Sequence, residues 1–469
     1  MLFRSVYHHS ILKTNLKLPV LLKSSSRTTK LWSFSADVGS ASPKESHFGR
    51  SFHTSSVMCF ETEACTCNRS MASVLLASPK TPTIDSCRTH ISTGFNWLRF
   101  TILLAERIVN GHLKDLTSDQ RADCFVFDDS LYSRTGYKKT ELAAKVFDHV
   151  SMTYKKFFRM MTMGWTDGSS LVPIASSLLS SKNDQNVIGT TKKIDKRTIA
   201  AKRRIMAQSK GTDVVIQLLD QVLKAGLTAK YVMFDTWFSN PHQIVQISQR
   251  GLNVIAMVKK SSKITYEFEE KRMNVKQIFN AGKKRRGRSR YLLSVPVKVG
   301  DPAKDGAQID ARIVCVRNRS NRKDWIALIC TDMTIDENEI IRIYGKRWDI
   351  EVFFKTCKSF LKLGTEYHGL SYDALTAHTA FVFLRYMFMS VEKRDDEDDR
   401  TIGELFYCMV YELADITFNH SLQTLVEAMF ESVKEIFQPT EEQMERFTNA
   451  FISRLPKYMQ EALSPSLAA

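Results

Sequence analysis

Four residues that could bind a phosphate or a metal ion lie at helical spacing in the last third of the chain. They are Tyr344, Arg347, Glu351 and Lys358, within a stretch whose apolar residues recur at three- and four-residue steps. We therefore predict one helix over Ile340–Lys362. At about 100° per residue, the four side chains fall within roughly 60° of one another, so one face carries a carboxylate, two cations and a phenol.

A charged stripe on a helix is often no more than a solvated face. Here Trp348 and the pair Phe353–Phe354 stand between the charged positions. We expect these aromatic side chains to bury the remaining faces of the helix, which would hold the charged stripe in a fixed place. The stripe is therefore a candidate functional site, with the solvated face as the alternative.

Two apolar stretches upstream end in aspartates. The run CFVFDDSLYSRTG stops at Asp128 and Asp129, and YVMFDTWFSN reaches Asp235. Each predicts a buried strand that delivers its acid to a loop at the strand end. Two-metal cleavage of a phosphodiester needs converging carboxylates, and Mg²⁺ prefers oxygen ligands. These aspartates, with Glu351 from a helix laid across them, would supply such a site.

Composition favours a polyanionic partner and a soluble, intracellular protein. The net charge is +17 and the pI is near 9.4, and cations that neutralise DNA phosphates release counterions. No apolar run approaches the roughly 18 residues that span a bilayer. The nine cysteines are scattered, and neither they nor the separated histidines form a zinc pattern, so zinc chemistry is disfavoured.

Periodicity divides the chain into five segments and predicts an α/β protein. Three strands in a row, the first ending in carboxylates, are how an RNase H-like domain opens. We expect a mixed sheet flanked by helices, interrupted by a β-rich insertion and followed by a helical carboxyl-terminal region. The expected segments are an atypical Ser/Thr-rich basic arm over 1–90, the first part of the core over 91–252, the insertion over 253–335, the last part of the core over 336–393, and the helical region over 394–469.

Two basic stretches are candidate phosphate contacts. One is KKIDKRTIAAKRRIMAQSK, near the end of the first core segment, and the other is GKKRRGRSR in the insertion. The alternative for each is a solvated helix, loop or hairpin tip. We prefer a DNA-contacting loop for the second stretch, because it holds six cations in nine residues. Its first four cations are Lys283, Lys284, Arg285 and Arg286.

The spacing Tyr-x2-Arg-x3-Glu-x6-Lys resembles the Y-R-E-K signature of DDE transposases of the bacterial insertion-sequence-four family. The pieces FDDSLYSR, MGWTDGSSLVP, VMFDTWFSN and YGKRWDIEVFFKTCK also resemble that family in order and context. The resemblance implies a catalytic, metal-binding triad of Asp129, Asp235 and Glu351, with Asp128 as the alternative first acid. It also implies that the Tyr, Arg and Lys of the signature, Tyr344, Arg347 and Lys358, bind the DNA of the transposon end.

The same resemblance sets the remaining expectations. It implies Mg²⁺ as cofactor, with Mn²⁺ as a substitute, and cut-and-paste transposition through a hairpin intermediate. The partners would be double-stranded DNA, as terminal inverted repeats and target, and a second copy of the chain in a synaptic dimer, in the bacterial cytoplasm at the nucleoid. Two alternatives remain open: an RNase H-like endonuclease without strand transfer, and a non-catalytic DNA-binding relic of a transposase.

The amino-terminal arm fits this reading least well. Residues 1–90 are basic and Ser-rich, have no acid before Asp37, and do not resemble the DNA-binding region of the family. A transit peptide has this composition. We prefer a disordered basic arm, or upstream sequence translated in the wrong frame or from an early start, because the sequence that follows resembles a bacterial protein.

Overall fold

The structure is a computed structural model. It describes residues 94–463, apart from short gaps at 117–120, 134–135, 149–150, 287–288, 319–320, 322–323, 366–368 and 396–400. The predicted amino-terminal arm lies outside the described residues. The chain divides into two compact units, whose described parts are 94–395 and 401–463, and each is considered by itself.

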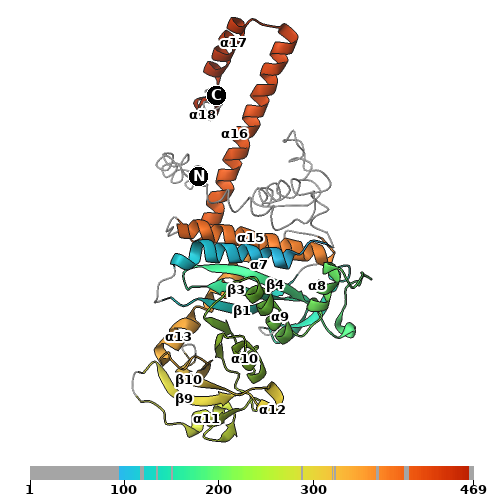
Figure 1. Ribbon diagram of the computed structural model, residues 1–469. Helices are drawn as coiled ribbons and strands as arrows, with labels where there is room; N and C mark the ends of the chain where they lie inside the picture. Colours follow the sequence, from blue (N-terminus) through green and yellow to red (C-terminus); the bar gives the residue numbers. More distant parts are fainter. Residues whose placement is uncertain are drawn as a thin grey trace. The chain divides into compact units, whose positions relative to one another are not determined.

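Five strands of the first unit form the part of the sheet that carries the candidate acids (Figure 1). Their spatial order is β4, β3, β1, β5, β6, in which β1 is antiparallel to β3 and parallel to β5, and β5 is parallel to β6. A short strand, β2, pairs with the first half of β3. The bounds are β1 (Cys124–Tyr132), β2 (Ala144–Asp148), β3 (Thr153–Thr166), β4 (Leu171–Leu179), β5 (Tyr231–Phe234) and β6 (Asn253–Met257).

The predicted β-rich insertion continues this sheet instead of forming one of its own. Strand β11 pairs antiparallel with β6, and β10, β9, β7 and β8 follow outward. In β9 every second residue from Tyr291 to Val299 is buried and the residues between them are at least partly exposed, which fits a sheet with one packed face. The bounds are β7 (Tyr266–Phe268), β8 (Lys271–Met273), β9 (Tyr291–Val299), β10 (Ile309–Arg317) and β11 (Trp325–Cys330), with the short helices α11 (Val275–Ala281) and α12 (Pro302–Asp305) between them.

One expectation about strand β1 is wrong. The strand was expected to end at its two aspartates, but it runs through them to Tyr132, because its antiparallel pairing with β3 continues from Cys124↔Thr166 to Tyr132↔Phe158. Its pairing with β5 covers only Cys124 to Val126. Beyond Val126 the β5 side of the strand is therefore open, and the aspartates stand at this opening.

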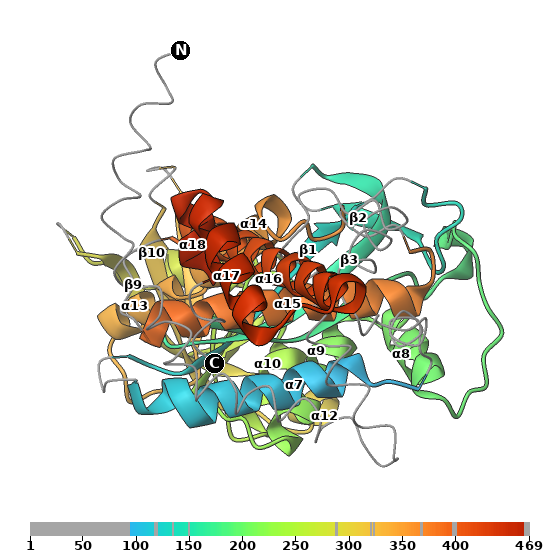
Figure 2. The same ribbon diagram turned by 90° about the horizontal axis from the view of Figure 1, so that it is seen from above.

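Helices cover the core sheet. Helices α7 (Trp97–Ile108) and α15 (Tyr372–Asp395) lie side by side against β4 (Figures 1 and 2). Helices α9 (Gly211–Lys224) and α10 (Pro241–Ser248) pack on each other and connect β4 to β5 and β5 to β6. Both crossovers join parallel strands and run in the same direction along the sheet, so right-handed connections place both helices on one face. Other short elements are the turns η1 (Val109–Leu113), η2 (Lys114–Leu116) and η3 (Asp184–Asn186), and helix α8 (Ile199–Ala207).

Helix α15 is long and apolar enough to span a membrane by length and composition. The stretch Tyr372–Arg394 meets that test, but 83% of its most apolar window is buried inside the protein. A helix whose apolar residues are already covered by α7 and β4 needs no lipid to cover them. We therefore read α15 as a core helix of the first unit.

The architecture is mixed α/β with one large mixed sheet and flanking helices. The strand order β4-β3-β1-β5-β6 and its antiparallel and parallel pairings are consistent with the RNase H-like core that the sequence predicts. The turn between β3 and β4 contains the predicted Asp167-Gly168 hairpin signal, and Gly168 adopts a positive φ of 89° there.

The basic stretch before α9 is partly structural, contrary to its reading as a phosphate contact. Arg204 of α8 is buried and bonds two acids, with Nε donating to Glu141 at 2.8 Å and Nη2 donating to Asp373 at 2.7 Å. Arg203 is paired with Asp373 as well. Buried charges are retained only when they are paired, so these two arginines join α8, the loop before β2 and the start of α15.

The second unit is helical, but the first two helices predicted from its periodicity form a single helix. Its described residues form α16 (Ile402–Phe437), α17 (Glu441–Arg454) and α18 (Lys457–Leu463). The segments TIGELFYCMVYELADI and SLQTLVEAMFESVKEIF were expected to be separate helices, but α16 runs through both. No Gly or Pro stands between them to stop the helix. Capping boxes at Thr401 and Thr440 begin α16 and α17.

The buried ion network yields the first prediction. We expect Arg204→Met to lower the free energy of unfolding of the first unit by about 3–5 kcal/mol, because it leaves Glu141 and Asp373 buried without their main cation. Chemical denaturation followed by circular dichroism measures the change.

Arg197→Ala is the matched control. Arg197 lies in the same basic stretch and pairs with Asp195, but its side chain is 91% exposed. An exposed pair contributes little, so this variant should unfold like the wild type. Equal midpoints for Arg204→Met and the wild type would contradict the structural role of Arg204.

Candidate active site

Two aspartates meet where β1 and β5 stop pairing. Val126 pairs with Met233 in the parallel register, so two residues further along, Asp128 lies level with Asp235. Burial raises the pKa of the Asp128 carboxyl to about 7, and the nearby negative charge of Asp235 contributes to the rise. Burial also raises the pKa of Asp235, and the negative charge of Asp129 contributes to that rise, so both aspartates of β1 lie near Asp235. Such a cluster of carboxyl groups favours a bound proton or a cation among them.

Consecutive residues of a strand face opposite sides of the sheet, and Asp128 and Asp129 do so. The Asp128 carboxylate lies 3.4 Å from the Arg347 guanidinium. The Asp129 carboxylate instead forms an ion pair with Arg159 of β3. On the Arg159 side, Met161 of β3 lies 3.8 Å from a Cβ placed on Gly211, which identifies this face as the α9 face.

The predicted single helix over Ile340–Lys362 is two helices. They are α13 (Glu337–Gly345) and α14 (Trp348–Ser359), joined by a tight turn in which the amide of Lys346 bonds the carbonyl of Ile343 and that of Arg347 bonds the carbonyl of Tyr344. These three-residue steps follow Gly345, a weak helix former, and they tighten the chain between the helices.

Arg347 connects the signature residues in spite of this break. Its guanidinium forms an ion pair with Glu351 one turn along α14, approaches Asp128, and lies 5.8 Å from the centre of the Tyr344 ring. Lys358, two turns beyond Glu351, donates to the Ser130 hydroxyl at 2.6 Å. The four residues of the predicted stripe therefore lie on the side of β1 that Asp128 faces. They are Tyr344, Arg347, Glu351 and Lys358.

The aromatic residues of this helix behave differently from one another. Phe353 and Phe354 are buried, as expected, and Phe353 packs edge-on against Phe383 and Tyr386 of α15. Trp348 was expected to be buried too, but it is 61% exposed. It stands two positions before the buried Ile350 and so about 160° from that residue around the helix, which points it away from the core.

A buried lysine attaches the turn to the sheet, and sequence reasoning missed it. The Lys346 ammonium donates to the carbonyls of Ala122 at 3.1 Å and Asp167 at 2.6 Å. Thr166 donates to the Asp349 carboxylate at 2.7 Å. A Cβ on Gly168 would lie 2.8 Å from the Lys346 side chain, so the glycine makes room for it.

This attachment fixes where α14 begins. Lys346 and Asp349 flank Arg347, so holding both to the β3–β4 turn orients the arginine toward Asp128. The turn sequence Trp-Thr-Asp-Gly-Ser was a signal for a hairpin only. Local spacing could not show that Lys346, 179 residues further along the chain, donates a hydrogen bond to this turn.

The predicted basic loop is exposed. Lys283, Lys284, Arg285 and Arg286 follow α11, and within the described residues no contact joins them to the acids. The Lys284 ammonium lies 4.8 Å from the Phe279 ring centre, and the Arg285 guanidinium lies 4.5 Å from that of Tyr291. The rings hold two of the cations near the surface of the insertion.

The donor chemistry of the acids suits a hard divalent cation. Asp235 is close enough to Asp128 for its negative charge to add to the effect of burial on the pKa of Asp128. Both residues offer carboxylate oxygens, which are the ligands that Mg²⁺ prefers. Glu351 reaches this pair only through Arg347. Across the described residues, no group of three or more His, Cys, Asp or Glu side chains is arranged to hold a metal ion. A three-carboxylate site would thus require Glu351 to exchange Arg347 for the cation.

The raised pKa of Asp128 yields the second prediction. Between the pKa of an unfolded aspartate, about 4, and the folded value of about 7, the folded protein holds the extra proton, so stability falls as pH rises through that window. Asp128→Asn removes this loss. Its stability relative to wild type should grow by up to about 4 kcal/mol between about pH 4 and pH 8, at about 1.36 kcal/mol per pKa unit.

Urea denaturation of wild type and Asp128→Asn across this pH range measures the difference. A constant difference at all pH values would show that the Asp128 carboxyl is not held in a buried, acid-rich setting.

Comparison with known families now bears on the site. A family model described as DDE superfamily endonuclease matches residues 45–323, more than half of the chain. The match includes Asp128, Asp129 and Asp235, begins inside the arm over 1–90, and ends before Glu351. A search of curated proteins finds no match. Enzymes of this superfamily generally use divalent metal ions and act on DNA. The chain belongs to the DDE superfamily of endonucleases.

Proposed function

We propose that this DDE endonuclease is a transposase of the insertion-sequence-four type, which cuts the ends of its element and joins them to target DNA. The observation that carries the proposal is the shared position of Asp128, Asp235 and Arg347, with Glu351 bound to the same arginine. The Y-R-E-K residues thus gather at the paired aspartates, which a stripe of merely solvated charges would not do.

We propose Asp128, Asp235 and Glu351 as the metal-binding acids. Asp128 replaces Asp129 as the preferred first acid, because it lies on the face from which α14 approaches, whereas Asp129 is paired with Arg159 on the other face. That Asp129 is the first acid stays an untested alternative. When bound there, Mg²⁺, or Mn²⁺ in its place, supplies charge stabilisation at the scissile phosphate and a more acidic water.

In this proposal the side chains of Arg347 and Lys358 bind the DNA backbone. Arg347 compensates Asp128 and Glu351 in the free protein, and it can turn its planar fork toward a phosphate when a metal takes over the acids. Lys358 is an exposed point charge beside Ser130, on the strand that carries Asp128. Both cations can therefore contact the DNA backbone next to the scissile bond.

An endonuclease without strand transfer is the second candidate. The two aspartates alone would serve it equally well, but nicking by acids and metal has no need of a Tyr, an Arg and a Lys gathered on the same face. The third reading, a non-catalytic relic, is disfavoured because the acids, Arg347 and Lys358 stand in one arrangement.

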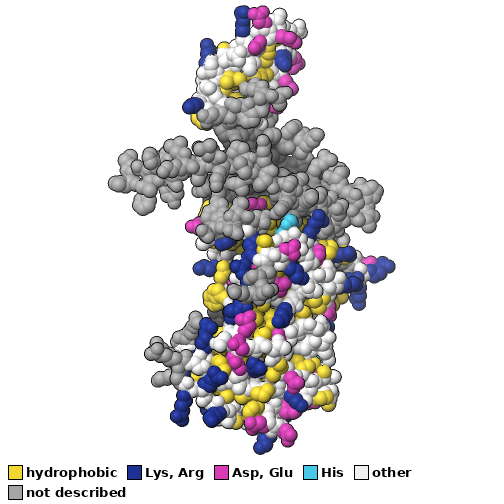
Figure 3. Space-filling view, turned by 60° about the vertical axis from the view of Figure 1, so that its left-hand side comes forward, with side chains coloured by type: hydrophobic (Ala, Val, Ile, Leu, Met, Phe, Trp, Pro, Cys, Tyr) yellow, Lys and Arg dark blue, Asp and Glu magenta, His cyan; other side chains and the backbone are white. Residues whose placement is uncertain are grey.

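The resemblance supports the remaining parts of the proposal. Terminal inverted repeats and target DNA would be the DNA partners, a synaptic homodimer the active assembly, a hairpin end the intermediate, and the nucleoid of a bacterial cytoplasm the location. The exposed loop Lys283–Arg286 and the net charge of +17 support a large phosphate-binding surface. Figure 3 shows Lys and Arg side chains over much of one face, interspersed with acidic ones.

The third prediction concerns the acids. Asp128→Asn, Asp235→Asn and Glu351→Gln should each reduce Mg²⁺-dependent nicking of supercoiled plasmid at least a hundredfold, since each removes a metal ligand and several kcal/mol of transition-state stabilisation. DNA binding, measured by gel shift, should change little because it depends on many cations.

Asp129→Asn discriminates between the two candidate first acids. We expect it to retain far more nicking activity than Asp128→Asn. The reverse order would restore Asp129 as the first acid, and unchanged nicking in Asp235→Asn would remove that residue from the site.

The fourth prediction concerns the basic loop. Replacing Lys283 and Lys284 with alanine should make DNA affinity less dependent on salt. Each lost phosphate contact reduces the log–log slope by about 0.9, so the double variant should lose up to about 1.8. Fluorescence anisotropy with duplex DNA at several salt concentrations measures this slope.

A matched control removes Lys298 and Lys304, exposed lysines of β9 and α12 in the same insertion. Lys298 stands at the opposite end of β9 from the loop. If both double variants gave the same slope, the loop would be an ordinary solvated tip.

A further inference from the structure

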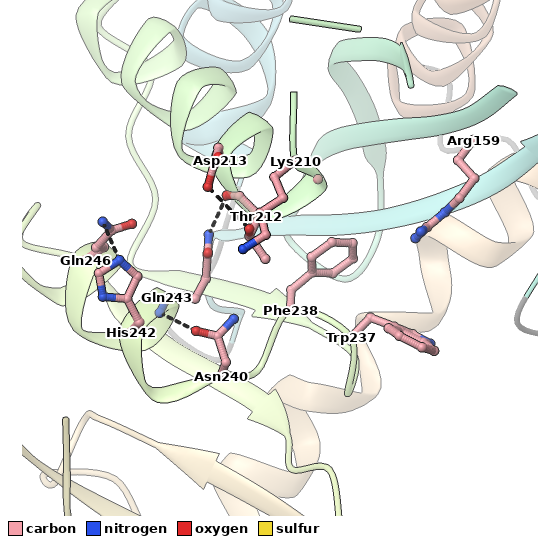
Figure 4. A pocket seen from close by; sticks show the side chains of 11 residues that line it. Arg159, Lys210, Thr212, Asp213, Trp237, Phe238, Asn240, His242, Gln243 and Gln246 are labelled. Atoms are coloured by element: carbon pink, nitrogen blue, oxygen red, sulfur yellow. Dashed lines mark hydrogen bonds between the residues drawn. The ribbon is translucent and has the colours of Figure 1, made fainter. Parts of the chain in front are cut away.

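A pocket opens on the other face of β1 from Asp128 and has no role in the function proposed above. Its cavity volume is about 630 Å³, within the range of small-ligand sites. Arg159 of β3, the first turn of α9, the loop after β5 and the first turn of α10 line it (Figure 4). Its main polar and aromatic side chains are those of Arg159, Lys210, Asp213, Trp237, His242 and Gln243.

The pocket lies next to the candidate acids. Arg159 forms an ion pair with Asp129, the neighbour of Asp128. The Trp237 amide donates to the Asp235 carboxylate at 2.9 Å. A strand whose scissile phosphate lies at Asp128 and Asp235 would thus have this pocket beside it.

We propose that the pocket is a subsite for one nucleotide of the DNA strand held at the acids. Its phosphate would lie between Arg159 and Lys210, and its base would lie against the Trp237 indole. The proposal deepens the proposed function and rests on it for the identity of the ligand as DNA.

The charges of the pocket fit this orientation. Arg159 and Lys210 bring two cations to the lining, and a third, the Lys259 ammonium, lies 4.3 Å from the centre of the Trp237 ring. The acid in the lining, Asp213, accepts a hydrogen bond from its neighbour Thr212 at 3.4 Å. Cations and amides in one lining suit a ligand with an anionic and a polar part.

The wall of the pocket provides both a stacking surface and hydrogen-bonding groups. Trp237 is 39% exposed, whereas Phe238 beside it is buried and completes the apolar side. At the far end, Gln243 is held by the carbonyl of Thr212 at 3.2 Å, and Gln246 contacts His242 at 3.0 Å (Figure 4). Aromatic walls bind any base by stacking, and fixed amides can add a preference among bases.

The fifth prediction tests this subsite by binding. The probe is a short fluorescein-labelled single-stranded oligodeoxynucleotide, titrated in buffer without metal and followed by anisotropy. Trp237→Ala should raise its Kd about tenfold, consistent with the loss of one stacked base. Lys210→Ala should raise it by a smaller factor and reduce its salt dependence.

Two variants are controls. Trp237→Phe keeps an aromatic ring and should bind closer to wild type than Trp237→Ala. Lys224→Ala removes an exposed lysine at the opposite end of α9 and should leave the Kd unchanged. If all four variants bound like the wild type, the pocket would be a solvent-filled hollow and the proposal would fall.

A crosslinking arm keeps the test decisive if a Trp237 variant does not fold. An oligonucleotide that contains 5-iodouracil is irradiated with the wild-type chain, and the attached peptide is identified by mass spectrometry. We expect attachment within 237–246, and attachment only elsewhere would overturn the proposal.

Plasmid nicking by the wild type is measured in parallel. Nicking together with normal binding by the variants would reject the subsite alone. Weakened binding by the variants without any wild-type nicking would retain the subsite and reject the nuclease.

Discussion

The parallel pairing of β1 with β5 is the constraint on which the site depends. Both strands are buried and apolar up to the last paired residues, Val126 and Met233, and there the pairing stops. Strand β1 continues because β3 still pairs with it, whereas the chain leaves β5 at once. Asp128 and Asp235 are thereby level at an opening in the sheet, where burial and then the negative charge of Asp235 raise the pKa of Asp128.

The position of Glu351, the proposed third acid, depends on a different constraint, the attachment of the turn between α13 and α14. Lys346 and Asp349 bond the β3–β4 turn on both sides of Arg347. Phe353 and Phe354 of α14 are buried, and Phe353 packs against Tyr386 of α15, which holds the helix in place. Together these contacts allow one arginine to pair with both Asp128 and Glu351, which leaves the free site with more carboxyl groups than cations once Asp235 is included.

Local pattern predicted the strands that carry the acids, the β3–β4 hairpin and the common face of Arg347, Glu351 and Lys358. It could not choose between Asp128 and Asp129, because the choice depends on which face of the sheet α14 approaches. Periodicity also missed the turn after Gly345, since three-residue steps preserve the apolar spacing of a helix.

Long-range polar contacts were equally beyond sequence reasoning. Arg204 lies in a run of cations that reads as a solvated or DNA-binding face, yet its partners come from residues 63 and 169 positions away. Lys346 is similar. In both cases the group that the basic side chain bonds decides whether the residue is structural or available to bind DNA. Spacing along the chain does not reveal that group.

The most direct test of the account is Mn²⁺ binding measured by electron paramagnetic resonance on the full chain. Mn²⁺ is the substitute expected for Mg²⁺, and its signal reports bound ions without any need for activity or DNA. The account predicts that the wild type and Asp129→Asn bind Mn²⁺ alike, whereas Asp128→Asn and Asp235→Asn lose that binding. Full Mn²⁺ binding by Asp128→Asn, with loss in Asp129→Asn, would contradict the placement of the site on the Arg347 face of β1.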